Sequence, residues 1–291
     1  MAEDPAPALG DRVVLVTGAT DGLGRAVARE LASRGAAVLL HGRSEARLAD
    51  TARQIRRAAA NDRVRTYLAD FSSLEDVRRL GREVLAGEDR LDVLVNNAGI
   101  GGGRDRRLRE ESADGHELRF AVNFLAPFLL THLLLPLMRR SAPARIVNVA
   151  SAGQEPIDFE DVMLERRYDG LRAYRQSKLA QVMFTFELAD RLRAEGHEGV
   201  TVNVLHPASL MNTKMVQESF GRTMSTVEEG MESTVRLAVA PELEGVTGRY
   251  FDRSHEARAE DQAYDPEARR RLWTLSARLA GVSGSTGHRA A

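Results

Sequence analysis

The stretch Val13-Val14-Leu15-Val16-Thr17-Gly18-Ala19-Thr20-Asp21-Gly22-Leu23-Gly24 decides the fold class of this chain. Its four apolar residues are typical of a strand that is covered on both faces. The glycines that follow permit a tight turn, and the helix expected after them offers free N–H groups to a phosphate. A glycine-rich loop between a first strand and a helix indicates a dinucleotide site, although Gly-x-x-x-Gly-x-Gly differs from the usual Gly-x-Gly-x-x-Gly.

Apolar runs of the same kind recur along the chain and alternate with stretches of helical periodicity. The predicted strands are 13–16, 37–40, 64–68, 91–95, 146–149, 200–205 and a short seventh at 248–251. The predicted helices are 23–34, 45–59, 73–86, 113–138, 171–195, 226–239 and 266–279. This alternation predicts an α/β fold of Rossmann type, a doubly wound parallel sheet of about seven strands in the order 3-2-1-4-5-6-7 with helices on both faces.

No linker interrupts the alternation, so we expect a single domain over residues 11–280. Its cofactor-binding half is expected at about 11–150, and its catalytic and substrate-lid half at about 151–280. The ends, 1–10 and 281–291, are predicted to be flexible tails. Two long connections, 101–115 and 152–170, do not fit the alternation, and in a compact domain such connections are more often functional than idle.

The composition excludes several classes of function. A formal net charge of −1 gives no field for nucleic acid, and a chain without cysteine has no disulfide, thiolate nucleophile or zinc–thiolate site. The histidines lack metal-ligand spacing, so we expect no metal. The N-terminus is acidic and proline-rich, unlike a signal peptide, and we therefore predict a cytoplasmic protein.

Residues 120–138 form an apolar run without a formal charge, which is long enough to cross a membrane. The run also contains Asn123, Pro127, His132 and Pro136, which suit a membrane span poorly. A helix buried between a sheet and a partner subunit explains the same composition. We therefore predict such a helix and no membrane span.

Only two of the 41 basic residues are lysines, Lys178 and Lys214, and Lys178 follows Tyr174 by four positions. Positions i and i+4 share one face of a helix, so the ammonium group can lie beside the phenol and lower its pKa. A phenol tuned in this way can give or take a proton near neutral pH. An exposed pair without function has the same spacing, and the role of Lys214 stays open.

Taken together, these motifs resemble the short-chain dehydrogenases/reductases. Residues 17–24 are similar to the cofactor loop of that family, and Asn96-Asn97-Ala98-Gly99 matches its Asn-Asn-Ala-Gly motif. His206-Pro207-Ala208 resembles its Pro-Gly step, with an alanine in place of the glycine, and Thr213 resembles the threonine that follows. The separation of 23 residues between Ser151 and Tyr174 is similar to that of the retinol-dehydrogenase-like branch, whose members act on apolar carbonyls and alcohols.

The resemblance implies a catalytic set. It gives Tyr174 the proton transfer, Lys178 the lowering of the phenol pKa and the binding of the nicotinamide ribose, and Ser151 a hydrogen bond to the substrate oxygen. Asn123 resembles the residue that holds a water relaying protons to Lys178. A helix cap for Ser151 and a satisfied buried amide for Asn123 are the alternatives. The implied cofactor-binding residues are Gly18, Thr20, Asp21, Gly22, Leu23, Gly24, Arg43, Ser44, Asp70, Phe71, Asn97, Ala98, Gly99, Tyr174, Lys178, Pro207, Ala208 and Thr213.

The end of the second predicted strand bears on the choice of cofactor. An NAD site places an acid there to bind the ribose 2′-hydroxyl, whereas this chain reads His41-Gly42-Arg43-Ser44. A guanidinium group can pair with a 2′-phosphate, so the sequence predicts NADP(H) in preference to NAD. The alternative is that Arg43 is one more surface arginine. Asp70-Phe71 resembles the adenine contact of the family, although Asp70 could instead cap a helix, a role that Ser72 or Ser73 could equally fill.

The predicted function is that of an NADP(H)-dependent oxidoreductase that interconverts a carbonyl and an alcohol by hydride transfer, with Tyr174 as general acid/base. The alternatives are a regulatory protein that senses NADP(H) without turnover, and an epimerase or dehydratase, whose loop is usually Gly-x-x-Gly-x-x-Gly. The partner would be a small-molecule carbonyl or alcohol. The helix 120–138 and the helix of Tyr174 resemble the family's subunit interface, so we expect a homodimer or homotetramer. Segments 152–170 and 210–224 are expected to line the substrate pocket. They carry Met163, Leu164, Met211, Met215 and Phe220 beside Arg166, Arg167 and Lys214, and the arginines are expected to be solvated surface.

Overall fold

The computed structural model describes residues 9–213, 215–217 and 223–282. The predicted tails lie largely outside these residues, as do Lys214 and Phe220. Leu9 lies within the predicted tail, but it is buried in the core and its N–H donates to Arg34 O at 2.8 Å. The ordered fold therefore starts before residue 11.

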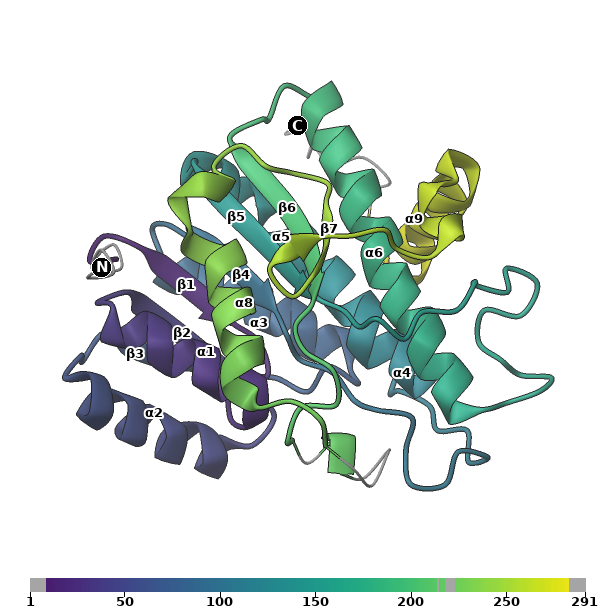
Figure 1. The fold of residues 1–291 in the computed structure, drawn as a ribbon, viewed down its shortest axis with the longest axis horizontal. Helices are drawn as coiled ribbons and strands as arrows, with labels where there is room; N and C mark the ends of the chain where they lie inside the picture. The colour runs from purple at the N-terminus through teal and green to yellow at the C-terminus, as the bar shows by residue number, and fades with distance from the viewer. Residues whose placement is uncertain (1–8, 214, 218–222, 283–291) are drawn as a thin grey trace.

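A single sheet with strand order β3-β2-β1-β4-β5-β6-β7-β8 forms the centre of the molecule (Figure 1). The strands are β1 (Val13–Val16), β2 (Ala37–Gly42), β3 (Val64–Leu68), β4 (Val93–Asn96), β5 (Ala144–Val149), β6 (Val200–His206), β7 (Tyr250–Asp252) and β8 (His255–Glu256). All neighbours are parallel except β7 and β8. The predicted Rossmann-type order is confirmed, and the two-residue antiparallel β8 is added at one edge.

The helices form a layer on each face of the sheet. They are α1 (Gly22–Ser33), α2 (Glu45–Ala59), α3 (Leu74–Gly87), α4 (Leu118–Phe120), α5 (Ala126–Arg140), α6 (Gly170–Ala194), α8 (Val227–Val239) and α9 (Pro266–Leu279), with a π-helical turn at Ala121–Leu125 and 3-10 turns at Pro241–Leu243 and Asp261–Tyr264. Helix α1 packs against α2 and α8, and Figure 1 shows these three helices together on one side of the sheet. Helices α3, α5, α6 and α9 pack together on the other side.

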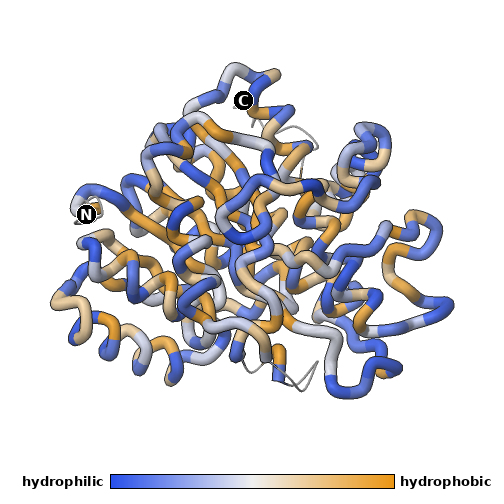
Figure 2. Tube along the Cα trace, viewed as in Figure 1, coloured by the Kyte–Doolittle hydropathy of each residue, from blue (hydrophilic) through white to orange (hydrophobic). Residues whose placement is uncertain are grey.

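Each strand supplies both layers because its side chains alternate. In β1, Val14 and Val16 contact the core under α1, whereas Leu15 contacts the core under α3 and α5. This is why the strands are apolar throughout instead of alternating with polar residues. Figure 2 shows the result as hydrophobic residues concentrated along the sheet and hydrophilic residues in the peripheral loops.

The predicted helix 113–138 begins later than its sequence pattern indicates. Residues 112–116 form a turn in which Ser112 N–H donates to His116 O at 2.8 Å, and helix begins only at Leu118. The carboxylate of Glu117 accepts from Phe120 N–H at 2.7 Å and so caps the first turn. The segment is then helical to Arg140, with a π-helical turn around Asn123. Such turns are rare and often occur at functional sites.

The apolar helix is buried within its own chain. It is long and apolar enough to cross a membrane, but most of it is enclosed by the fold. Trp273 of α9 packs against Phe128 of α5 and Phe184 of α6, with ring centroids 5.3 and 5.8 Å apart. The expected partner subunit is therefore not needed to explain the burial, and homo-oligomerisation remains a prediction.

Candidate functional site

Many of the predicted site residues lie at one edge of the sheet, because they follow the carboxyl ends of parallel strands. Gly18 follows β1, Arg43 follows β2, Asp70 follows β3, Asn97 follows β4 and Ser151 follows β5. Pro207 likewise follows β6. In open α/β sheets this edge is where ligands bind.

The glycine loop is tied directly to the loop after β4. Thr17 Oγ1 accepts hydrogen bonds from Asn97 N–H at 2.9 Å and from Ala98 N–H at 3.0 Å. The side-chain amide of Asn97 returns a hydrogen bond to Thr17 O at 2.8 Å. The first two predicted cofactor motifs are thus brought together in a single hydrogen-bonded unit.

Two glycines in this unit leave no room for a side chain. A Cβ at Gly24 would lie 2.4 Å from Gly18 O and from Asn97 Nδ2, and Gly18 has a φ of +65°. A Cβ at Gly22, whose φ is +48°, would lie 3.1 Å from Thr213 Cγ2. Thr213, which the resemblance implied as a cofactor-binding residue, therefore lies against the glycine loop at Gly22.

His41 connects the ends of three strands through hydrogen bonds, a role that the sequence did not predict. Gly18 N–H donates to His41 Nδ1 at 3.2 Å, so Nε2 carries the proton and donates to Ala69 O at 3.1 Å. The ring stacks on Phe71 with centroids 4.2 Å apart. Burial lowers the pKa of His41 to about 4, and the imidazole is therefore neutral at physiological pH. The sequence signal for this role was the place of His41 at the end of an apolar strand, directly before Gly42-Arg43.

Charged side chains surround the end of β2. Arg43 is exposed, and within the described residues its side chain has no hydrogen-bond or ion-pair partner. Ser44 accepts from Arg47 N–H at 3.5 Å and caps α2, while the Arg47 guanidinium pairs with Asp21 at 2.8 Å. Asp21 in turn caps α1 by accepting from Gly22 N–H at 2.8 Å. Asp21 and Ser44 thus have structural contacts here, and Arg43 is left accessible.

Asp70 faces the same region from the end of β3. One of its carboxylate oxygens accepts from Ser72 N–H and from the Ser72 hydroxyl, both at 2.9 Å. Helix α3 is capped instead by Ser73, which accepts from Asp76 N–H at 3.3 Å. The alternative role of Asp70 as the cap of α3 is therefore wrong.

Ser151, Tyr174 and Lys178 meet beside the end of β5. The Tyr174 hydroxyl is hydrogen-bonded to the Ser151 side chain, which also accepts from Gly153 N–H at 3.1 Å. The ammonium group of Lys178 lies 5.7 Å from the centroid of the Tyr174 ring. It donates to Val149 O at 2.9 Å, and the residue is only 4% exposed.

The electrostatics of this pair differ from the sequence expectation. Burial raises the pKa of Tyr174, and the hydrogen bond with Ser151 opposes that rise, whereas a lysine-induced lowering was predicted. Burial also lowers the pKa of Lys178 to about 7, because a desolvated ammonium group loses its hydration. Lys178 then carries only part of a positive charge near neutral pH, which weakens its effect on the phenol.

Asn123 lies next to this group without bonding to Lys178. Its Oδ1 accepts from Ile100 N–H at 2.8 Å, and its Nδ2 donates to Ile100 O at 3.0 Å and to Ser177 Oγ at 2.9 Å. A Cβ at Gly99 would lie 3.2 Å from Asn123 Oδ1 and 3.7 Å from Lys178 Nζ, so Gly99 separates the two. The side chain of Asn123 fastens the loop after β4 to α6.

The segment 152–170 is hydrogen-bonded to the C-terminal part of the chain. The side chain of Gln262 accepts from Ile157 N–H at 2.7 Å and donates to Ile157 O at 3.1 Å. Leu164, predicted to line a pocket, is 1% exposed and belongs to the core, and Met163 packs against that core. Leu164 is therefore not part of an open pocket wall, whereas Met163 is half-buried.

The residues after β6 are buried as well. Pro207 O accepts from the Ser233 hydroxyl at 2.9 Å, and Ala208 is buried with a negative φ. The alanine is therefore compatible with the position where the related motif has glycine. Met211 and Met215 are half-buried.

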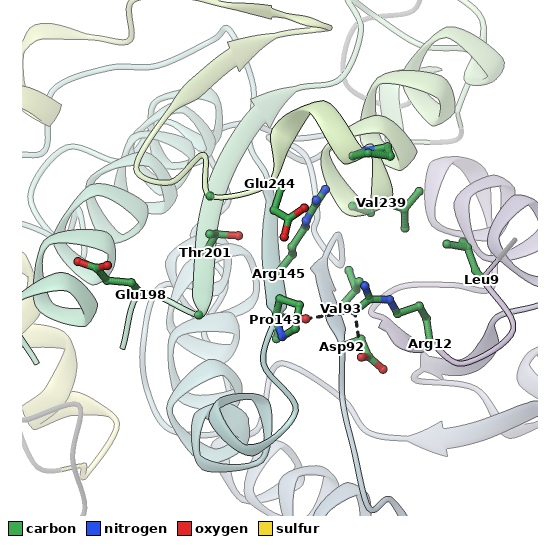
Figure 3. Close-up of a pocket in the computed structure, with 15 residues that line it drawn as sticks. Leu9, Arg12, Asp92, Val93, Pro143, Arg145, Glu198, Thr201, Val239 and Glu244 are labelled. Carbon is green, nitrogen blue, oxygen red and sulfur yellow. Dashed lines mark hydrogen bonds and ion pairs between the residues drawn. The ribbon is translucent and has the colours of Figure 1, made fainter. Parts of the chain in front are cut away.

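A cavity of about 380 Å³ lies elsewhere in the fold (Figure 3). Several residues that line it lie just before the first residue of a strand: Arg12 before β1, Asp92 before β4, Pro143 before β5 and Glu198 before β6. The cavity therefore opens at the amino edge of the sheet, opposite the predicted site, and none of the predicted site residues lines it.

Comparison with known proteins agrees with this geometry. The sequence model of the family described as short chain dehydrogenase matches residues 12–223. Mouse retinol dehydrogenase 13 is 40% identical over 95% of this chain and 86% of its own length, and human retinol dehydrogenase 14 is 38% identical over 93% and 87%. Among solved structures, an uncharacterized protein of Mycobacterium paratuberculosis superposes with a TM-score of 0.77 at 29% identity, covering 95% of this chain and 96% of the other. A short chain dehydrogenase of Shigella flexneri 2a complexed with NADP gives 0.69 at 28% identity, covering 85% and 99%.

Proposed function

The chain belongs to the short-chain dehydrogenase family, and on that premise we propose that it is an NADP(H)-dependent oxidoreductase that interconverts a carbonyl and an alcohol. The observation that carries this proposal is the meeting of Ser151, Tyr174 and Lys178 at the carboxyl edge of the sheet, beside the glycine loop. A proton donor, a hydrogen-bonding hydroxyl and a cation in one place suit a reaction in which an oxygen gains or loses a proton.

The residues at this edge fit a dinucleotide. Gly18 and Gly24 allow the glycine loop to fold tightly against Asn97 and Ala98, where a Cβ would clash, and α1 begins at Gly22 with its free N–H groups at this edge. The exposed guanidinium of Arg43 suits a 2′-phosphate, which supports NADP(H) over NAD. Asp70 keeps a second carboxylate oxygen for the adenine, and Asn97, Ala98 and Gly99 would lie under the nicotinamide half.

When bound, the nicotinamide supplies or accepts a hydride. The chain's own residues handle the oxygen and its proton. Ser151 would donate to the substrate oxygen and orient it, and Tyr174 would give a proton to that oxygen in the reductive direction. The raised pKa of Tyr174 keeps the phenol protonated at neutral pH, so its proton is available in the reductive direction. Lys178 would hold ribose hydroxyls and stabilise negative charge that develops on the phenol.

The substrate is proposed to be a bulky apolar aldehyde, ketone or alcohol. Support comes from the relatives described as retinol dehydrogenases, which align over nearly the whole chain. The half-buried Met211 and Met215 suit an adaptable apolar pocket, and Met211 lies close to Leu23 of the glycine loop. A cytoplasmic location and a homodimer or homotetramer remain parts of the same proposal.

A sensor that binds NADPH without turnover is the second candidate. A sensor has no need for a phenol hydrogen-bonded to Ser151 and flanked by a buried lysine, so the catalytic reading is favoured. A panel of apolar aldehydes and ketones, followed by the loss of NADPH absorbance, separates the two. Binding of NADPH with no oxidation by any member of the panel would favour the sensor.

Two variants test the assignment. Tyr174→Phe removes the proton donor while keeping the ring, and we expect turnover to fall by about 100- to 10,000-fold with NADPH binding near normal. Arg43→Leu should weaken NADPH binding and leave NADH binding unchanged, because only NADPH carries the 2′-phosphate. Substantial turnover by Tyr174→Phe would refute the proton-transfer role, and equal losses for both cofactors would refute the role of Arg43.

A further inference from the structure

Lys178 is held by a side chain that the catalytic set does not include. Gln181 Oε1 accepts a hydrogen bond from Lys178 Nζ at 2.9 Å, on the same face of α6 and one turn further on. Within residues 9–213, 215–217 and 223–282, Gln181 is the only side chain that hydrogen-bonds to this ammonium group. The side-chain amide of Asn123 is engaged by Ile100 and Ser177 and does not bond to Lys178 directly.

Gln181 is itself fixed by a buried polar chain. Its backbone oxygen accepts from Thr185 Oγ1 at 2.8 Å, and Thr185 Oγ1 accepts from Asn148 Nδ2 at 2.8 Å. Asn148 Oδ1 accepts from Asn96 Nδ2 at 2.9 Å. The chain therefore links β4 and β5 to the turn of α6 that carries Gln181, and it keeps that turn at a fixed distance from the end of β5.

The side-chain amide has a second, unusual property. Gln181 is 2% exposed, and its Nε2 is buried without a hydrogen-bond partner. Turning the amide over would place Nε2 against the ammonium group, where two donors would face each other. A buried amide that keeps one unsatisfied group calls for an explanation, and a functional contact is one.

From these contacts we propose that Gln181 is a positioning residue of the reaction, which fixes the Lys178 ammonium group against Val149 O and leaves its third N–H free for the active site. The proposal rests on the proposed function. An ammonium group has three donors, and Val149 O and Gln181 Oε1 take two of them. An amide oxygen beside a buried cation also favours its charged form, because it replaces part of the lost hydration.

The lysine count of this chain makes a direct test possible. With only Lys178 and Lys214 in the sequence, protein grown with carbon-13 at the lysine ε position gives two signals, and Lys214→Arg assigns them. In the wild type the Lys178 signal should titrate near 7, since burial lowers its pKa to about that value. Gln181→Met, which keeps the length of the side chain, should lower the midpoint by about one pH unit, and Gln181→Glu should raise it by about one.

The same variants carry the activity test. The upper pH limb of kcat should move in the same direction as the Lys178 midpoint in each variant, while Gln176→Met, on the same helix with its amide on Pro156 O, should leave both unmoved. A purely structural role would not shift the two Gln181 variants in opposite directions. An unchanged Lys178 midpoint in both folded variants would overturn the proposal. Failure of the proposed function would appear separately, as a wild type that titrates as expected but turns over no carbonyl with NADPH.

Discussion

The glycine loop and the segment 152–170 lie at the same edge of the sheet but are held in different ways. The glycine loop is fixed by its own backbone and by Asn97, its neighbour across β1 and β4. Residues 152–169 form no helix or strand, and they are held by Gln262 and Glu260, about a hundred positions later in the chain, as well as by nearer residues such as Gln176. The first region is held by hydrogen bonds between loops that follow neighbouring strands, and the second is held in part by the C-terminal segment, which is not one of those loops.

This difference predicts where stability and function separate. Damage to the C-terminal part should loosen the substrate side and leave the cofactor loop intact. Damage to the contacts of the glycine loop should act on the cofactor side first. Three variants, in order of decreasing effect on the free energy of unfolding, test this division.

Trp273→Ala should have the largest effect. The indole is buried among Phe128, Phe184 and His132, and Arg191 stacks on it at 4.2 Å, so removing it leaves a large cavity. We expect a loss of about 3–5 kcal/mol in the free energy of unfolding, measured by chemical denaturation. Exposed Arg270 on the same helix provides the control, and Arg270→Ala should change it by less than about 0.5 kcal/mol.

The Trp273 variant also bears on the expected oligomer. Because α9 covers the aromatic face of α5 and α6, its loosening would expose apolar surface. Sedimentation of the wild type tests the predicted dimer or tetramer directly. A Trp273→Ala protein as stable as the wild type would mean that α9 does not support the substrate side at all.

His41→Asn should have the next effect, and it depends on pH. The pKa of His41 is lowered by burial from 6.5 to about 4, so between these values the unfolded chain binds a proton that the folded protein does not. Folding stability contributed by the neutral ring is thus present above pH 6.5 and is lost as the pH falls toward 4, by on the order of 3 kcal/mol. The asparagine oxygen can still accept from Gly18 N–H, so the variant should lose this pH dependence and keep the loop.

The control for this prediction is His255→Asn, since His255 is exposed. His132, whose pKa is also lowered by burial to about 4, contributes equally to all three proteins and cancels in the comparison. Chemical denaturation at pH 7.5 and pH 5 measures how much the free energy of unfolding of each protein changes with pH. If His41→Asn and the wild type lose the same stability on acidification, the ring is not buried and neutral as described.

The features that could be predicted from the sequence divide in a similar way. The strand order and the glycine loop could be predicted from strand alternation and from residues close in sequence. The neighbourhood of Ser151, Tyr174 and Lys178 followed from the resemblance to the family, with the i, i+4 spacing of Tyr174 and Lys178 beside it. The start of the helix predicted from residue 113 could not be predicted correctly. Its cap is the hydrogen bond from Phe120 N–H to the Glu117 carboxylate, and this bond does not change the apolar pattern from which the helix was predicted. The pKa of Tyr174 was predicted in the wrong direction, since charge proximity is visible in sequence and desolvation is not.

Contacts between distant segments were also beyond the sequence. Leu164 is apolar, as a pocket residue would be, but it is buried, and the segment 152–170 that contains it is hydrogen-bonded to the C-terminal segment through Ile157. Gln181 could have been found, because it follows Lys178 by three positions on a helix and so shares its face. His41 gave a weaker signal, because its partners Gly18 and Ala69 lie on different strand ends.

Gln262→Leu should have the smallest effect on stability and the most selective effect on function. It removes both hydrogen bonds to Ile157 and leaves the Ile157 N–H and C=O without their partner, at a cost of about 1 kcal/mol. The segment 152–170 then loosens while the glycine loop is untouched, so KM for the carbonyl substrate should rise severalfold and the Kd for NADPH should stay constant. Asp261→Asn, which disturbs only an exposed ion pair with Arg258, provides the matched control. A parallel loss of NADPH affinity in Gln262→Leu would show that the two regions are coupled, and the division between them would then be wrong.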